Sequence, residues 1–364
     1  MNLGVFLAIG ESWEEFERNG QDTLLLNNNL KYYARAFTKV FVFSYGVKSS
    51  IHIQPNVFLV GNRFGLHRFV YALLLPLIHY RLVRRCDVLR GMQLTGVLPC
   101  LAGKVLFGKK IVFNYGYDYR KAARSRNQVF RAWLFLCLKY LAAYLADAVI
   151  ATTKRLKYSY PPYLQNKIYL IPNGVDTHLF CPQIQKRVYK KATAIFVGRL
   201  EAQKNPELLL NSIARLSKIN RQLLLIGSGT LKNKLLDLAR KFKVKVTYYA
   251  SIPHHELPMY YNQARIFMLV SQFEGHPKAL LEAMSCGLPV IGTDVEGIND
   301  VIIPNFNGLL VKQTVKDISQ KLKLLLRNKY LARKLGNNAR KTIIEKYDTD
   351  VTWEKEIRLL KNII

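Results

Sequence analysis

A nine-residue segment in the second half of the chain, residues 274–282 (Glu-Gly-His-Pro-Lys-Ala-Leu-Leu-Glu), has the residue types of a site for an anionic, hydroxyl-rich ligand. It follows an apolar run at residues 266–270, and Pro277 suits the first position of a helix because its missing N–H would be unpaired there. The free N–H groups and the positive dipole end of a helix start can hold a phosphate. Glu274 would lie just outside this helix end and Glu282 inside the helix. The segment therefore predicts a loop-to-helix junction that binds phosphate and hydroxyl groups.

Two cations earlier in the chain have the spacing of a diphosphate clamp. The motif Val-Gly-Arg-Leu at residues 197–200 ends an apolar run, and Lys-Asn-Pro at residues 204–206 precedes a helical pattern. Arg199 can bind a phosphate bidentately, whereas Lys204 acts as a point charge. The alternative is that both are solvated surface cations. The Gly-Ser-Gly turn at residues 227–229 either contacts the ligand or needs glycine only for its backbone geometry.

Apolar runs alternate with helical patterns along both halves of the chain, which is typical of parallel sheets with crossover helices. A turn signal, Pro172-Asn173-Gly174, divides the halves. We predict an α/β protein of two doubly wound, Rossmann-like domains, residues 1–172 and 173–346, with a helix at residues 347–364 returning to the first domain. Ligands of such sheets bind at the carboxyl ends of the strands, so the expected site is the cleft between the domains. The strand candidates are residues 3–8, 40–44, 57–60, 87–89, 111–114, 148–151, 168–171, 195–197, 223–226, 244–248, 266–270 and 290–291.

As a set, the motifs of the second half resemble those of the retaining GT-B glycosyltransferases of the large family 4 class, the glycosyl transferases group 1. The resemblance implies the GT-B architecture, in which two Rossmann-like domains face a central cleft, and a nucleotide-sugar donor. It also implies that neither a metal nor another cofactor takes part. The matching motifs, in the family's order and spacing, are residues 172–176, 197–200, 204–206, 274–282 and 289–293.

The resemblance implies a role for each matched residue. Arg199 and Lys204 would hold the donor's diphosphate and stabilise the departing nucleotide. Glu282 would accept hydrogen bonds from the ribose hydroxyls, and Glu274 would face the transferred sugar, unless it merely caps the helix. Ser251 would border the base. The other residues expected to contact the donor are Gly198, Gly227, His276, Pro277, Lys278 and Ala279.

Charge development during the reaction fits this arrangement. When a glycosyl diphosphate bond breaks, negative charge grows on the leaving phosphate, and prearranged cations lower the barrier. The front-face mechanism proposed for the family needs no carboxylate nucleophile, so Glu274 and Glu282 are not assigned the paired roles of retaining hydrolases. On the acceptor side, Asp118 ends a strand candidate and is our candidate to orient or deprotonate the acceptor hydroxyl. A turn carboxylate paired with Arg120 is the alternative.

The sequence contains little that indicates a metal-binding site. Asp348-Thr349-Asp350 has the Asp-x-Asp form that metal-using glycosyltransferases of a different fold employ. It stands between two helical patterns, however, where Asp350 or Thr349 would serve as an N-cap. The five cysteines never form a Cys-x-x-Cys spacing, which indicates reduced thiols of a cytosolic protein.

The chain is strongly basic, with a net charge of +31 and a pI near 10.0. Residues 48–141 alone contain 16 Lys and Arg residues but only two acidic ones, Asp87 and Asp118. The apolar stretches at residues 69–78 and 128–150 are too short or too interrupted to span a membrane, which takes roughly 20 apolar residues. With their basic flanks they either lie in an anionic lipid interface or pack on the sheet with basic outer faces.

The predicted function is a hexosyltransferase that moves a hexose from a UDP- or GDP-sugar to a saccharide or lipid-linked acceptor in surface polysaccharide or glycan biosynthesis. We expect it in the cytoplasm, peripheral on the inner face of the membrane. One alternative is a nucleotide-sugar epimerase on the same fold. The other is a basic nucleic-acid-binding protein, which the absence of a recognised motif and of an aromatic stacking strip disfavours.

Overall fold

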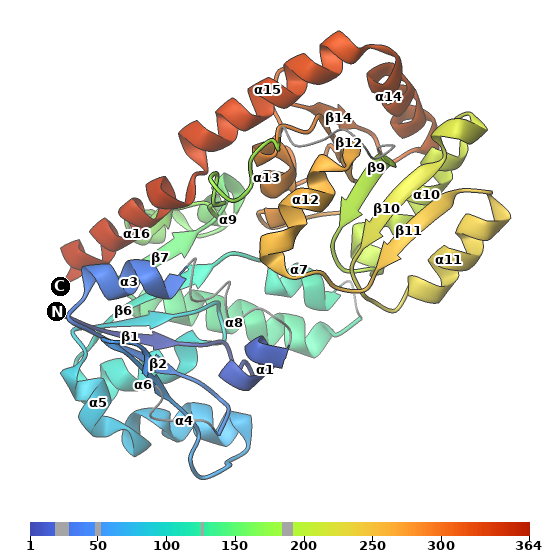
Figure 1. Ribbon diagram of the computed structural model, residues 1–364. Coiled ribbons are helices and arrows are strands. Elements are labelled where there is room, and N and C mark those ends of the chain that lie inside the picture. Colours follow the sequence, from blue (N-terminus) through green and yellow to red (C-terminus); the bar gives the residue numbers. More distant parts are fainter. Residues whose placement is uncertain (19–28, 48–51, 125–126, 184–191) are drawn as a thin grey trace. The chain divides into compact units, whose positions relative to one another are not determined.

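The computed structural model describes residues 1–18, 29–47, 52–124, 127–183 and 192–364. The chain forms two compact α/β units, which Figure 1 colours along the sequence. The first unit comprises Met1–Pro172 together with Trp353–Ile364, and the second comprises Asn173–Thr352.

The first unit is built on a sheet of strand order β3-β4-β2-β1-β5-β6-β7-β8. All neighbours run parallel except β3 and β4. Strand β3 was not predicted, because its sequence His-Ile-Gln contains a single apolar residue. The strands are β1 (Asn2–Phe6), β2 (Lys39–Phe43), β3 (His52–Gln54), β4 (Val57–Val60), β5 (Val88–Gly91), β6 (Lys110–Tyr115), β7 (Ala148–Ala151) and β8 (Ile168–Leu170).

Helices cover both faces of this sheet. Tyr71, Leu75, Val97 and Ala142 pack with sheet residues such as Phe113 on one face. The other face packs against α3 and the end of α16. The predicted helical stretch at residues 128–150 ends at Leu145, after which the chain enters β7. The helices are α1 (Trp13–Arg18), α3 (Lys31–Ala36), α4 (Arg68–Ile78), α5 (Tyr80–Arg85), α6 (Val97–Phe107), α7 (Tyr119–Arg124), α8 (Val129–Leu145), α9 (Lys154–Tyr158), the 3-10 helix η2 (Pro162–Lys167) and α16 (Thr349–Ile363).

The second unit has a wholly parallel sheet of order β11-β10-β9-β12-β13-β14. Numbered from its own first strand this is 3-2-1-4-5-6, the order of a doubly wound Rossmann sheet, so the predicted fold class is confirmed. The direction of winding reverses between β9 and β12, and this switch point is where ligands of such sheets bind. The strands are β9 (Ala192–Val197), β10 (Gln222–Ile226), β11 (Lys245–Tyr249), β12 (Ala264–Leu269), β13 (Val290–Thr293) and the unpredicted β14 (Leu309–Val311).

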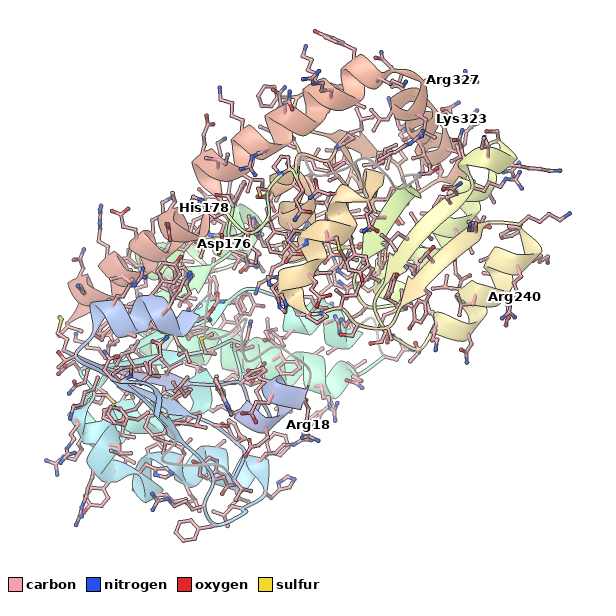
Figure 2. All side chains as sticks on the ribbon, in the orientation of Figure 1. Arg18, Asp176, His178, Arg240, Lys323 and Arg327 are labelled. Carbon is pink, nitrogen blue, oxygen red and sulfur yellow. The ribbon has the colours of Figure 1, made fainter. Side chains whose placement is uncertain are left out.

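The helices of the second unit carry much of the chain's positive charge on their outer sides. Figure 2 shows Arg240 on α11 and Lys323 and Arg327 on α14 pointing outward, and all three are exposed. Part of the net charge is therefore an ordinary solvated surface. The elements are η3 (Ala202–Lys204), α10 (Pro206–Ala214), η4 (Lys218–Asn220), α11 (Lys232–Lys241), η5 (His254–Glu256), α12 (Leu257–Asn262), α13 (Lys278–Ser285), α14 (Val315–Arg327) and α15 (Lys329–Lys346).

A buried ion pair holds the last helix in the first unit. Arg90 on the central strand β5 is 2% exposed, and its Nε donates to Glu356 Oε1 of α16 at 2.8 Å. The hydroxyl of Tyr33 donates to the same oxygen at 2.6 Å, and the Tyr33 ring meets Trp353 edge to face. A buried guanidinium without a counter-charge would be strongly destabilising, so Glu356 fixes where α16 packs.

We expect Glu356→Ala to lower the free energy of unfolding of the first unit by about 3–5 kcal/mol, because it leaves the Arg90 charge buried and unpaired. Urea denaturation followed by circular dichroism measures this loss. Glu354→Ala is the matched control, since Glu354 pairs with Arg358 on the exposed side of the same helix. Equal stabilities of the two variants would contradict the anchoring role.

Candidate functional site

Two loops meet at the switch point of the second sheet, one after β9 and one after β12. Lys204, at the end of η3, places its Nζ 2.6 Å from Oε1 of Glu274, and their side chains are 15% and 6% exposed. The hydroxyl of Ser271 donates to the same carboxylate oxygen at 2.5 Å. The Gln203 side chain also donates to the carbonyl of Phe273 at 2.9 Å. Side-chain and backbone contacts thus hold the two loops together.

The contact between Lys204 and Glu274 was not predicted. The sequence motifs predict Lys204 at the diphosphate and Glu274 at the sugar, whereas the structure brings the two charges into direct contact. Glu274 does not cap the following helix, because its carboxylate oxygen Oε1 is engaged by Lys204 and Ser271. Arg199, in the same β9 loop, is exposed.

The start of helix α13 differs by one residue from the prediction. Pro277 has extended backbone angles (φ −75°, ψ 105°) and precedes the first helical residue, Lys278. The prediction that Pro277 occupies the first helical position was therefore wrong. Its carbonyl accepts hydrogen bonds from the N–H groups of Leu280 and Leu281, as expected for a cap. The first N–H groups of a helix have no partner within it, so those of Lys278 and Ala279 are placed to meet a ligand.

Glu282 is held inside the unit by two side chains that the sequence motifs do not include. The hydroxyl of Tyr261 donates to Oε2 at 2.8 Å, and His254 Nε2 lies 3.0 Å from Oε1. Burial, together with the charge of Glu282, raises the pKa of Tyr261 well above its usual value. Glu282 is thus a fixed acceptor whose remaining lone pairs could serve a ligand hydroxyl. The spacing of Tyr261 and Glu282 along the chain gave no signal, because a turn, a strand and a loop separate them.

His276 lies buried in the loop before α13, with its ring centre 5.3 Å from that of Tyr347 and its Nδ1 lacking a partner among the described residues. Burial lowers the pKa of its imidazole to about 3, so the ring is neutral at physiological pH. Its backbone carbonyl accepts a hydrogen bond from Asn173 Nδ2 at 2.9 Å. Asn173, from the predicted turn, therefore positions the loop before α13.

The glycine turns at the carboxyl ends of β9 and β10 pack directly on each other. Gly227 has φ +140°, and a Cβ at this position would lie 1.9 Å from the carbonyl oxygen of Gly198. This close approach requires glycine whether or not a ligand binds. Ser251 is exposed just after β11. Donor contacts of Gly198, Gly227 and Ser251 stay predictions.

Asp118 has a structural task in the first unit. Its Oδ1 accepts the N–H of Lys121 at 3.0 Å and its carbonyl accepts that of Ala122, so it caps α7. Its role toward an acceptor stays a prediction. In the Asp-x-Asp segment the cap is Asp348, whose Oδ1 accepts the N–H of Asp350 at 2.8 Å. The prediction that Asp350 or Thr349 caps the last helix was therefore wrong.

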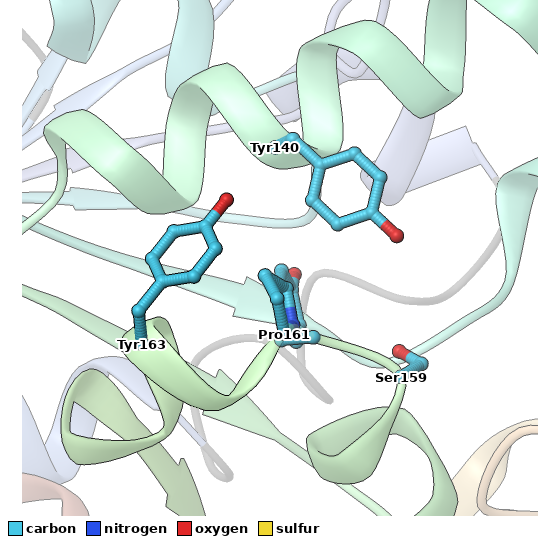
Figure 3. A pocket seen from close by; sticks show the side chains of 5 residues that line it. Tyr140, Ser159, Pro161 and Tyr163 are labelled. Carbon is cyan, nitrogen blue, oxygen red and sulfur yellow. The ribbon is translucent and has the colours of Figure 1, made fainter.

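A separate hollow of about 430 Å³ lies in the first unit (Figure 3). Beneath it, buried Lys139 donates to the Ser159 hydroxyl at 2.8 Å and lies 4.3 Å from the centre of the Tyr160 ring. Burial lowers the pKa of Lys139 to about 8. None of the predicted site residues takes part. The hollow is lined by Tyr140, Ser159, Tyr160, Pro161 and Tyr163.

Metal ligands do not gather anywhere in the described ranges, where no group of three His, Cys, Asp or Glu side chains could hold an ion. The prediction that no metal takes part stays a prediction. None of the helices within those ranges has the length and hydropathy that a membrane-spanning segment requires.

Residues 182–342 match the family model "Glycosyl transferases group 1". The chain is 31% identical over 179 residues to the Escherichia coli UDP-Gal:alpha-D-GlcNAc-diphosphoundecaprenol alpha-1,3-galactosyltransferase, a match covering 44% of this chain and 45% of that protein. The chain spans 57%, 61% and 62% of the length of three further curated relatives.

Two solved structures resemble the chain along its whole length. Sucrose-phosphate synthase from Thermosynechococcus elongatus has a TM-score of 0.83 at 20% identity, covering 100% of this chain and 99% of that one. The Anabaena protein HepE in complex with UDP has a TM-score of 0.78 at 14% identity, with both chains fully covered. At these identities the likeness is evidence for the fold alone, and it confirms the predicted GT-B fold.

The neutral, buried His276 generates a pH-dependence of stability. Its pKa in the folded state, about 3, is below that of an unfolded histidine, so the unfolded state binds more protons between the two values. Stability contributed by the neutral ring is fully present above about pH 6.5 and is lost as the pH falls toward 3. We expect acidification from pH 7 to pH 5 to cost wild type about 2 kcal/mol more than His276→Gln.

Urea denaturation at the two pH values measures the difference. His178→Gln is the matched control, because His178 is exposed on the second unit (Figure 2). If His276→Gln and His178→Gln lost stability equally on acidification, the prediction that His276 is buried in its neutral form would be refuted.

Proposed function

We propose that the protein is a nucleotide-sugar-dependent, retaining hexosyltransferase, on the premise that residues 182–342 match the glycosyl transferases group 1 model and that the chain has the GT-B fold. Its acceptor would be a saccharide or a lipid-linked saccharide in surface polysaccharide or glycan biosynthesis. It would work in the cytoplasm, at the inner face of the membrane, without a metal or other cofactor.

The contact between Lys204 and Glu274 at the switch point carries this proposal. It provides a cation for the donor's diphosphate and a carboxylate for the transferred sugar within one small region, at the place where doubly wound sheets bind nucleotides. The helix start at Lys278 and Ala279 adds backbone N–H groups that favour phosphate. Fixed Glu282 supplies an acceptor for ribose hydroxyls.

The proposed chemistry uses these groups as follows. The bond between the anomeric carbon of the sugar and the diphosphate oxygen breaks, and negative charge grows on the departing phosphate. Lys204 and Arg199 would stabilise that charge, Lys204 exchanging its contact with Glu274 for one with the phosphate. Glu274 would then face the sugar ring, which gains positive character. The acceptor hydroxyl would attack from the same face, with Asp118 orienting it or taking its proton.

Known proteins of similar sequence or fold support the donor and acceptor classes. The E. coli relative is named for UDP-Gal and a diphosphoundecaprenol-linked acceptor, and the HepE structure contains UDP. We therefore propose UDP- or GDP-hexose as donor. Melting temperatures with UDP, GDP, ADP and their sugars would identify the nucleotide, because a ligand that binds the folded state raises the melting temperature.

We expect Lys204→Ala and Glu282→Ala each to slow hexose transfer by about a hundredfold, because each removes a prearranged contact to the donor. Transfer of a labelled sugar to a lipid-linked acceptor measures the rate. Lys234→Ala and Glu345→Ala are matched controls, since both residues are exposed on the same unit.

Unchanged transfer in both Lys204→Ala and Glu282→Ala would refute the site. Formation of an epimerised nucleotide sugar without any acceptor would favour the epimerase alternative over the transferase. Salt-sensitive binding of nucleic acid, without any stabilisation by nucleoside diphosphates, would favour the nucleic-acid alternative.

A further inference from the structure

Helix α8 of the first unit carries its large apolar side chains on its outward side, which is unusual for a helix that faces water. Its buried positions are occupied by alanines and Lys139, whereas its outward positions carry large apolar side chains. Trp133 is 59% exposed and Phe130 is 71% exposed. A helix on the surface of a water-soluble domain normally shows the reverse pattern. The other exposed large apolar residues of α8 are Val129, Leu134, Tyr140, Leu141 and Tyr144.

Two neighbouring helices of the same layer share this property. Helix α6 packs against both α4 and α8, and all three cover one face of the first sheet (Figure 1). The outward side of α4 is wholly apolar after Arg68, and Leu73 is 65% exposed. On α6, Val105 and Leu106 are exposed. The remaining exposed apolar residues of α4 are Phe69, Val70, Leu74 and Leu77.

The charged side chains on these helices all have one sign, and Asp147, just beyond α8, is paired with Lys104 of α6. Helices α4, α5, α6 and α8 contain no Asp or Glu at all. Arginines lie at the start of α4, along α5 and at the start of α8. Exposed large apolar side chains gathered on three neighbouring helices mark an interaction site. The exposed basic residues around it are Arg68, Arg81, Arg84, Arg85 and Arg131.

We propose that the outward face of α4, α6 and α8 docks the protein on an anionic lipid bilayer. Apolar and aromatic side chains would enter the boundary between headgroups and acyl chains, as interfacial helices do. The arginines would contact lipid phosphates, and each cation near an anionic surface adds to binding. Exposed Trp and Tyr suit the headgroup level. A protein partner would need acidic groups around an apolar core, whereas a second copy would set arginines against arginines.

The inference rests on the proposed function only for its purpose, which is to bring the enzyme to a lipid-linked acceptor. Vesicle binding itself needs neither donor nor acceptor. If vesicles bind and sugar transfer is absent, the proposed function fails alone. If nucleotide binds and vesicles do not, the docking surface fails alone.

Cosedimentation of the full chain with vesicles tests the proposal. We expect binding to phosphatidylcholine vesicles that contain about one-third phosphatidylglycerol, little binding to pure phosphatidylcholine, and weakening by added salt. Phe130→Ser combined with Trp133→Ser should weaken binding about tenfold or more, since two inserted side chains are lost. Ile219→Ser combined with Tyr330→Ser is the matched control, because both residues are exposed apolar residues of the second unit.

The fluorescence of Trp133 gives an independent readout. Trp13 is buried and Trp353 packs against Tyr33 in the core on the other face of the sheet, so we expect Trp133 to account for most of the blue shift on vesicle binding. Trp133→Phe should remove most of that shift while binding persists. Unchanged melting curves would show that the serine variants fold, as their exposure leads us to expect. Three results would overturn the proposal: wild type failing to bind anionic vesicles, the α8 variant binding as well as its control, or wild type forming a dimer that the α8 variant abolishes.

Discussion

The contact between Lys204 and Glu274 is the interaction on which the candidate site depends. It joins residues that lie 70 positions apart and closes the switch point of the second sheet at the loops after β9 and β12. Partial burial strengthens the attraction between the two charges but also costs solvation, so such pairs are weak evidence for stability. An anion that reaches Lys204 offers it a second counter-charge. Under the proposed function, the pair would hold Lys204 in place for the diphosphate while the donor is absent.

The rest of the site consists of groups whose positions are fixed by side chains outside the motif. Tyr261 and His254 orient Glu282, and Asn173 holds the loop that contains His276. Burial keeps the His276 imidazole neutral, so this ring adds no positive charge to the loop before α13. A prearranged site of this kind avoids reorganisation during the reaction, which is how enzymes gain most from electrostatics.

Much of this could be predicted from the sequence, and the omissions have physical reasons. The apolar runs of β9, β10 and β12 are long enough to be recognised, whereas β3 and β14 have three residues each and too little pattern. The motifs identified most residues of the site. The contacts across the switch point depend on the strand order of the sheet, which cannot be read from a single sequence. Whether the apolar side of α8 faces the sheet or lies outward stayed open for a related reason. Periodicity finds the two sides of a helix but does not say which one faces the sheet.

Hydrogen–deuterium exchange with and without the nucleoside diphosphate that stabilises the protein most would test the central claim directly. The account predicts slower exchange on binding in two separate segments of the second unit, residues 198–204 and 276–282, because the diphosphate would meet Lys204 and the start of α13 together. It also predicts that Lys204→Ala loses protection in both segments at the same nucleotide concentration. Protection confined to one segment, or lying elsewhere in the chain, would contradict a donor site built on the contact between Lys204 and Glu274.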